Sequence, residues 1–211
     1  GGSLGRQGLP RPGHWLLTRV CQVLGGGVAG RMAAEGGEVR TERAGPEGRV
    51  LVIVFDHPPA NALGAGMRRA LMQALSEAAE PGLDGVVLAA AGRNFSAATA
   101  VDAAGEGDPA ADLQAAPTLA TLCAAIEDLA LPVVAALSGT AAGPGAELAL
   151  AAHARVAQAE ARIVFPDVAL GLPPQGGSSQ RLPRIVGAAE ALDLLLSARA
   201  MPAEEALALG L

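Results

Sequence analysis

Short apolar runs that alternate with segments of helical periodicity restrict this chain to an α/β fold. Residues 49–56 (RVLVIVFD), 85–90 (GVVLAA) and 131–137 (LPVVAAL) are almost wholly apolar, as in strands that are buried on both faces. Residues 63–80 carry apolar side chains at helical spacing, and residues 113–129 are also expected to be helical. This alternation predicts a domain whose ligand site lies at the carboxyl ends of the strands.

The N-terminal region differs in composition from the rest of the chain. Residues 1–34 contain four arginines and no acidic residue, and they are rich in glycine and proline. We expect them to form a flexible extension, although an organellar transit peptide has a similar composition. The regular pattern begins with a predicted strand over 38–43 (EVRTER), so that residues 35–211 form one domain.

Composition argues against several classes of partner. The net charge is −6 and no cluster of Lys and Arg occurs, so a nucleic-acid partner is not expected. The apolar runs are well short of the ~20 residues that cross a bilayer, so no membrane partner is expected. Cys21 and Cys123 lie far apart and lack the spacing of a metal site. We therefore expect no disulfide, no metal and a reducing, cytoplasmic location.

Three loops after strands hold the candidate chemistry, and two of their carboxylates are candidate site residues. Glu147 follows a glycine-rich turn that opens a helix beginning near Ala146, and Asp167 follows Phe-Pro. Locally, a carboxylate in a first helical turn often only complements the helix dipole, and Asp167 could be a surface turn residue. No dinucleotide fingerprint, P-loop, G-x-S-x-G or H-E-x-x-H motif occurs. His57 and His153 are assigned no role.

Four segments in order resemble motifs of the crotonase, or enoyl-CoA hydratase/isomerase, superfamily. They are HPPANAL (57–63), GRNFSAATAVD (92–102), VVAALSGTAAGPGAELALAAHARVA (133–157) and the segment from FPDVALGL to the last residue (165–211). The chain is most similar to the hydratase half of bifunctional enoyl-CoA hydratase/3-hydroxyacyl-CoA dehydrogenases.

The resemblance implies a spiral of ββα units with an acyl-CoA pocket. Coenzyme A would be part of the substrate, and no separate cofactor is expected. The C-terminal helices that cover the pocket and build trimers in this family are missing after Leu211, so we expect a domain over 35–211 that is truncated at its C-terminus. A homotrimer or hexamer is expected only if such helices exist.

The resemblance also implies a set of site residues. Glu147 and Asp167 fall on the catalytic acids, and the N–H groups of an oxyanion hole fall at Thr99 and at Pro144, which has no N–H. Gly143 and Gly145 flank that proline as substitute donors. The expected substrate-binding residues are Ala60, Ala62, Ala97, Thr99 and Gly143.

The chain departs from the family pattern at several of these positions. Pro144 removes a donor whose loss typically costs on the order of 10²–10³ in rate, although proline suits the first position of a helix. Ala98 and Ala100 replace a glycine and an aspartate, and Asp167 is one methylene shorter than the usual glutamate. The predicted function is therefore an enoyl-CoA hydratase with an impaired oxyanion hole. The alternatives are a weak or inactive acyl-CoA-binding homologue, and an enoyl-CoA isomerase or acyl-CoA hydrolase.

Overall fold

The computed structural model describes residues 30–34, 36–98 and 116–211. Its strands are β1 Gly30–Ala34, β2 Gly37–Ala44, β3 Val50–Asp56, β4 Gly85–Ala90, β5 Val133–Leu137, β6 Thr140–Ala142, β7 Ala154–Ala157, β8 Arg162–Val164 and β9 Met201–Pro202. Its α-helices are α2 Ala65–Ser76, α5 Leu119–Glu127, α6 Pro144–Ala151, α7 Ser178–Val186, α8 Ala188–Ser197 and α9 Ala203–Ala208. Short 3-10 helices are η1 Pro46–Gly48, η2 Glu77–Ala79 and η3 Val168–Leu170.

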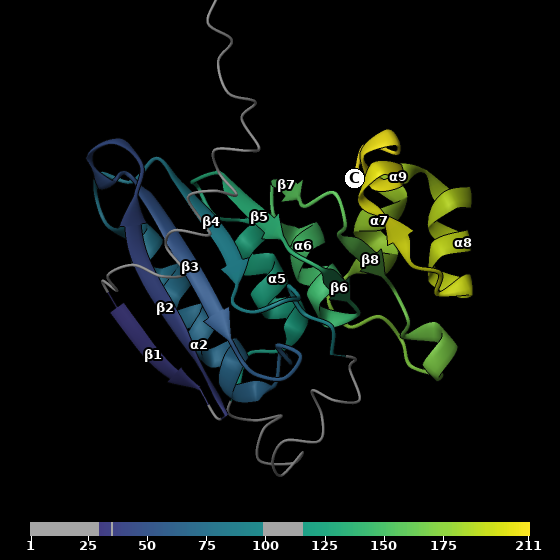
Figure 1. Cartoon of the computed structure of the whole chain (residues 1–211), viewed down its shortest axis with the longest axis horizontal. Helices are drawn as coiled ribbons and strands as arrows, with labels where there is room; N and C mark the ends of the chain where they lie inside the picture. The colour runs from purple at the N-terminus through teal and green to yellow at the C-terminus, as the bar shows by residue number, and fades with distance from the viewer. Residues whose placement is uncertain (1–29, 35, 99–115) are drawn as a thin grey trace, which may run out of the picture.

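The strands form two sheets (Figure 1). The larger sheet has six strands in the order β1-β2-β3-β4-β5-β7, and the smaller has three in the order β6-β8-β9. The pairs β1–β2 and β2–β3 are antiparallel, whereas β3, β4, β5 and β7 are parallel neighbours. The carboxyl ends of these four strands therefore open toward the same edge of the larger sheet.

The chain repeats a strand–strand–helix unit that divides its strands between the two sheets. In the unit β5-β6-α6, the first strand joins the larger sheet and the second joins the smaller one, and β7-β8-α7 repeats this division. After β4, Ser96 makes an isolated parallel bridge with Ala141 of β6, so this segment also reaches the smaller sheet. The predicted α/β fold of ββα units is confirmed.

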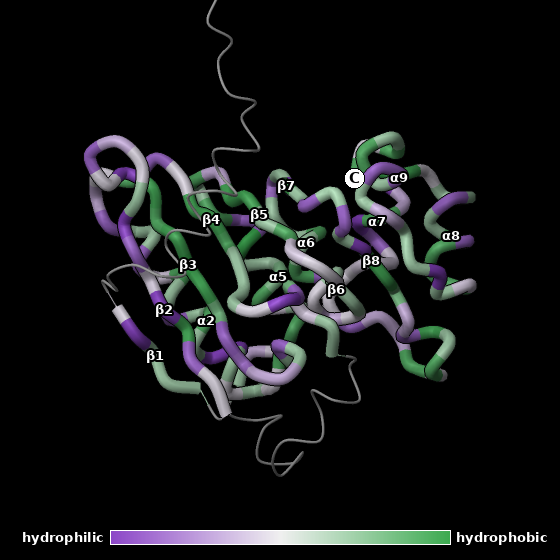
Figure 2. The backbone as a smooth tube through the Cα atoms, viewed as in Figure 1, coloured by the Kyte–Doolittle hydropathy of each residue, from purple (hydrophilic) through white to green (hydrophobic). Residues whose placement is uncertain are grey.

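Strand β3 is buried on both faces, as its unbroken apolar run predicts. Ile53 and Phe55 belong to the main core, and Val52 and Val54 belong to a second cluster on the other side of the strand. Figure 2 shows the resulting contrast between the hydrophobic β3 and its neighbour β2, which carries hydrophilic residues.

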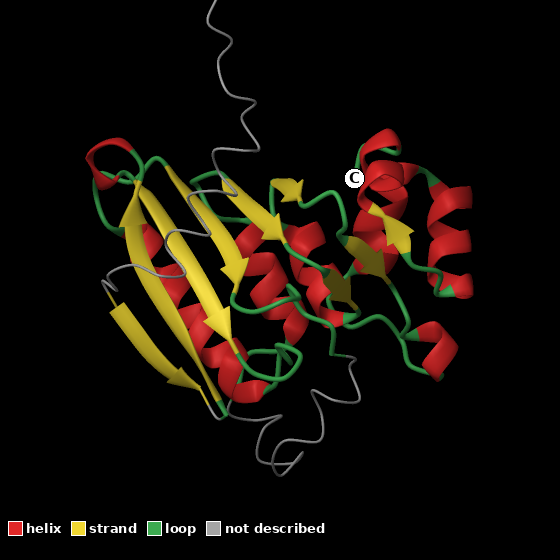
Figure 3. Ribbon diagram, in the orientation of Figure 1, coloured by secondary structure: helices red, strands yellow, loops and turns green. Residues whose placement is uncertain are grey.

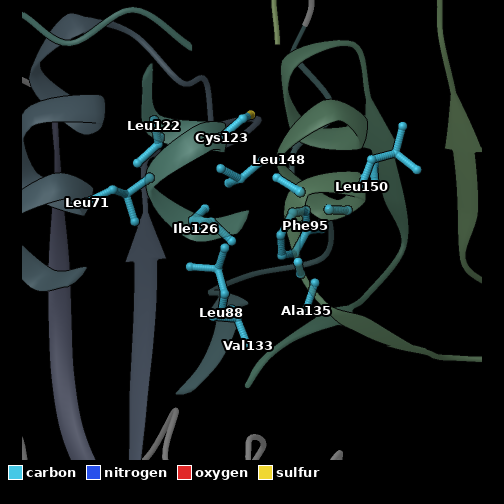
Figure 4. Packing of buried hydrophobic residues seen from close by; sticks show 14 of the residues in the cluster. Leu71, Leu88, Phe95, Leu122, Cys123, Ile126, Val133, Ala135, Leu148 and Leu150 are labelled. Carbon is cyan, nitrogen blue, oxygen red and sulfur yellow. The ribbon is translucent and has the colours of Figure 1, made fainter. Parts of the chain in front are cut away.

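Helices α2, α5 and α6 cover one face of the larger sheet (Figure 3). The apolar stripe of α2 is buried, and α5 begins after Thr118, whose Oγ1 accepts a hydrogen bond from the Thr121 N–H at 3.0 Å. All residues of α6 are buried, which makes it the central helix of the core. Figure 4 shows the packing of this layer around Leu71, Leu88, Phe95, Leu122, Cys123, Ile126, Val133, Ala135, Leu148 and Leu150.

Two predicted boundaries need correction. The expected flexible extension, residues 1–34, is wrong for residues 30–34, which form β1 and pair with β2 from Gly30↔Thr41 to Ala34↔Gly37. The helix expected near Ala146 begins at Pro144 instead. For the helix expected over 113–129, residues 113–115 lie outside the described part, and the described helix is α5.

Candidate active site

Two of the loops that follow strands are joined by backbone hydrogen bonds. The N–H of Ser96, after β4, donates to the carbonyl of Thr140 at 3.1 Å, and the N–H of Ala142 donates to the carbonyl of Ser96 at 2.7 Å. A Cβ added to Gly145 would lie 2.4 Å from Cβ of Ser96, so only glycine allows this approach. The loop after β4 therefore lies directly against the turn that opens α6.

The turn before α6 is built around Gly143 and Pro144. Gly143 has φ 46°, a backbone region that favours glycine. Its N–H donates to the carbonyl of Val164 in β8 at 3.0 Å, which connects the turn to the smaller sheet. Pro144 occupies the first helical position, where its missing N–H leaves no helical bond unmade. The turn keeps its shape, but neither residue offers a free N–H, and this geometry does not support the expected donor role of Gly143.

The Glu147 carboxylate is buried and is held by backbone N–H groups. The residue is 1% exposed. Its Oε2 accepts hydrogen bonds from the N–H groups of Gln175 at 3.2 Å and Gly176 at 2.6 Å, and its Oε1 accepts one from Ser178 at 2.9 Å. An ionised carboxylate has about four acceptor positions, so these bonds leave one for a further donor such as water, on Oε1.

The Asp167 carboxyl group lies beside the same turn. It is 2% exposed, and a Cβ built on Gly143 would lie 3.5 Å from its Oδ2 and 3.6 Å from its Oδ1. Burial, and then the charge of Glu147, raise the pKa of Asp167 above its ordinary value. Burial and the neighbouring charge therefore both oppose ionisation of Asp167.

The structure brings the two predicted carboxylates together at the start of α6. Asp167 faces Gly143, and the first helical hydrogen bond runs from the Glu147 N–H to the Gly143 carbonyl at 2.9 Å. The charge of Glu147 acts on the pKa of Asp167, as expected of two carboxyl groups in one site. Two buried carboxyl groups in one site, one of them with a raised pKa, can divide acid and base chemistry between them.

The remaining predicted residues lie around the loop after β4, as far as it is described. The N–H of Ala97 donates to the carbonyl of Ala60 at 2.9 Å, so these two expected substrate-binding residues are neighbours. Ala62 and Ala98 are buried, at 8% and 3% exposed. Thr99, the expected first oxyanion donor, lies outside the described residues, as does Ala100.

Sequence reasoning missed Asn61, which connects the turn after β3 to the loop after β4. It has φ 57°, its Oδ1 accepts the His57 N–H at 2.7 Å, and its Nδ2 donates to the carbonyls of Ala91 at 2.8 Å and Asn94 at 2.9 Å. The signal was present in HPPANAL, since asparagine tolerates a positive φ and its short amide can bond to the nearby backbone.

The described residues contain neither a metal-binding cluster nor a membrane-spanning helix. They contain no group of three or more His, Cys, Asp or Glu side chains placed to bind a metal ion. None of their helices combines the length and the apolar character that crossing a bilayer requires. Within this part, His153 accepts the Val133 N–H at 3.0 Å through Nδ1, which is a structural contact.

Known proteins are similar to this chain in both sequence and fold. The peroxisomal bifunctional enzyme of Danio rerio is 39% identical over 163 residues, which are 77% of this chain and 22% of that protein. The peroxisomal fatty acid beta-oxidation multifunctional protein AIM1 of Arabidopsis thaliana is 36% identical over 174 residues, 81% of this chain and 24% of that protein. The crystal structure of enoyl-CoA hydratase from Bacillus anthracis superposes with a TM-score of 0.72 at 30% identity, covering 82% of this chain and 67% of that one.

The fold and the site define a class of α/β proteins, which have spiralling ββα units and paired buried carboxyl groups. The family model described as enoyl-CoA hydratase/isomerase matches residues 44–211. The chain belongs to this family. It spans less than a quarter of the length of the two multifunctional relatives.

Proposed function

We propose that this chain is an enoyl-CoA hydratase-type enzyme, which adds water to 2-enoyl-CoA thioesters in fatty acid β-oxidation. The observation that carries the proposal is the meeting of Glu147 and Asp167, both buried, at the turn that opens α6. The names of the relatives, an enoyl-CoA hydratase and a fatty acid β-oxidation protein, support the substrate class. Coenzyme A enters as part of the substrate, and no other cofactor is needed.

Glu147 acts as the base in this proposal. Its free acceptor position on Oε1 holds a water molecule, while three backbone N–H groups keep the carboxylate in place. The water oxygen forms a bond to the β-carbon of the enoyl group, and the water proton passes to Glu147. The π electrons of the double bond move toward the thioester carbonyl, which becomes enolate-like.

Asp167 acts as the acid. In this proposal Asp167, whose pKa is raised, carries a proton and transfers it to the α-carbon as the enolate collapses. The product is a 3-hydroxyacyl-CoA. Glu147 then loses a proton to solvent and Asp167 regains one, so the atoms and charges balance over one turnover.

The oxyanion hole is the weak part of this site. Backbone N–H groups next to the thioester oxygen stabilise the charge that develops there. Pro144 supplies no N–H, and the N–H of Gly143 is bonded to Val164. We therefore propose that the Thr99 N–H is the main donor and that hydration is slow.

A second candidate function follows from the missing N–H of Pro144. A chain that lacks one donor can bind an acyl-CoA thioester without turning it over, and it would then act as a weak or inactive acyl-CoA-binding homologue. An enoyl-CoA isomerase or an acyl-CoA hydrolase is the neighbouring chemical alternative, in which one carboxyl group would dominate.

Two measurements on the intact chain separate these functions. Loss of the enoyl thioester absorbance on adding crotonyl-CoA reports hydration, and calorimetry with a saturated acyl-CoA reports binding. Turnover above the uncatalysed rate, abolished in Glu147→Gln, supports the hydratase. Binding without turnover supports the homologue, and neither binding nor turnover contradicts both.

A further inference from the structure

The guanidinium of Arg181 in α7 lies behind the turn that holds Glu147. Its Nη1 donates to the carbonyl of Gly176 at 2.5 Å, and its Nη2 donates to Oε2 of Glu127 in α5 at 2.6 Å. The side chain is 13% exposed, whereas that of Glu127 is 52% exposed. Arg181 thus connects Glu127, at the end of α5, to Gly176, whose own N–H donates to Glu147.

The turn over 175–177 has no regular secondary structure of its own to fix it. It consists of Gln175, Gly176 and Gly177 before α7, and Gly177 has φ 93°. A Cβ on Gly177 would lie 2.4 Å from Nη1 of Arg181, so the guanidinium is packed against this backbone. A Cβ on Gly176 would lie 2.8 Å from Cβ of Glu147, so the turn is also packed against the carboxylate side chain.

We propose that Arg181 is a positioning residue of this site, which holds the turn by its Gly176 carbonyl and thereby aims three backbone N–H groups at Glu147. Glu127 in turn orients the guanidinium from the surface. The expected effect of Arg181 on catalysis rests on the proposed hydration activity. Its expected effect on the turn that holds Glu147 does not.

The energetics of Arg181 also favour a positioning role over simple stabilisation. Its Nε is buried without a hydrogen-bond partner in the described part of the chain, and a buried cation costs free energy unless it is fully paired. An apolar side chain would fill the same space at a lower cost. A planar fork with two separate donors, by contrast, can hold a carbonyl and a carboxylate at the same time, which a lysine cannot reproduce.

Hydrogen exchange tests the connection without depending on activity. The amide protons of Gly176 and Ser178 are bonded to Glu147, so they exchange slowly in the intact chain. In Arg181→Met we expect both to exchange at least about tenfold faster, because the turn opens more often. Arg184→Met, on an exposed position of the same helix, is the matched control and is expected to leave both rates unchanged.

Steady-state kinetics provide a second test of the role of Arg181. Arg181→Met is expected to lower kcat by about 10²-fold with little change in KM, because it mispositions a base without removing a binding group. Arg181→Lys is expected to recover only part of this loss. A wild-type chain without hydratase activity would contradict the proposed function, while the exchange arm would still decide the role of Arg181.

Unchanged exchange at Gly176 and Ser178 in a folded Arg181→Met variant overturns the proposal. If that variant does not fold, Glu127→Gln takes its place, since it removes only the surface partner of the guanidinium. We then expect exchange that is about threefold faster at both amides, and rates equal to those of the wild type overturn the proposal.

Discussion

The N–H of Gly143 donates a hydrogen bond to the carbonyl of Val164 at 3.0 Å. This bond is the means by which the turn before α6 is attached to β8, and it uses the amide directly before Pro144. A proline at the next position then contributes no N–H. Gly143 and Pro144 are therefore two successive residues without a free backbone donor at the turn before α6.

Replacing Glu147 with glutamine should remove most of the hydration rate. The amide cannot take the proton of the attacking water, and loss of such a base typically costs about 10²–10⁴ in rate. The NH₂ group of the glutamine would also face backbone N–H groups, which in the wild type donate to a carboxylate oxygen of Glu147. Steady-state hydration of crotonyl-CoA checks this. Glu160→Gln, at an exposed position, is the matched control, and equal rates in the two variants would contradict a role for Glu147 as base.

Replacing Asp167 with asparagine should change how stability depends on pH. Because the folded pKa of Asp167 is raised above its ordinary value of 3.8, the folded chain binds more protons than the unfolded chain between these two pKa values. The contribution of Asp167 to the free energy of unfolding therefore falls as the pH rises through this window. The asparagine side chain does not titrate, so the stability of Asp167→Asn relative to the wild type should grow from acid to neutral pH.

Urea unfolding at a series of pH values measures this difference. Asp128→Asn, which removes a carboxylate at an exposed position after α5, is the matched control. A stability difference that stays constant with pH, or that shrinks as the pH rises, would show that burial does not raise the pKa of Asp167.

Replacing Leu148 with alanine should destabilise the chain by about 2–5 kcal/mol, because it opens a cavity in a packed core. Leu148 is 0% exposed and follows Glu147 in the fully buried helix α6. The midpoint of thermal unfolding checks this prediction. Leu207→Ala, where the side chain is 81% exposed, should change stability by less than about 0.5 kcal/mol. Equal effects of the two substitutions would place Leu148 outside the core.

The sequence was sufficient to predict the central elements of the fold. The strands β3, β4 and β5 are continuous apolar runs, and α2 has a clear helical stripe, so local pattern and tertiary burial agree. Strand β1 escaped prediction because Gly30–Ala34 alternates weakly and lies in a stretch rich in glycine and arginine. Its conformation comes from pairing with β2, which is a tertiary effect.

The candidate site could be predicted only in part for a similar reason. The motifs located Glu147 and Asp167, but the N–H groups that hold Glu147 come from residues 28 to 31 positions later in the chain. Backbone donors have no signature in side-chain type, so their direction cannot be inferred from the letters Gln-Gly-Gly-Ser. The contacts of Arg181 with Gly176 and Glu127 depend on how α5 and α7 pack, and they were not predicted either.

The most direct measurement of the central claim is crotonyl-CoA hydration by Pro144→Gly beside the wild type. Glycine restores an N–H at the start of α6, and we expect kcat to rise by about 10²–10³-fold. Pro202→Gly, before α9, removes a proline elsewhere and should leave the rate unchanged. A folded Pro144→Gly variant that hydrates crotonyl-CoA no faster than the wild type would contradict the account of a hydratase site limited by its missing amide donor.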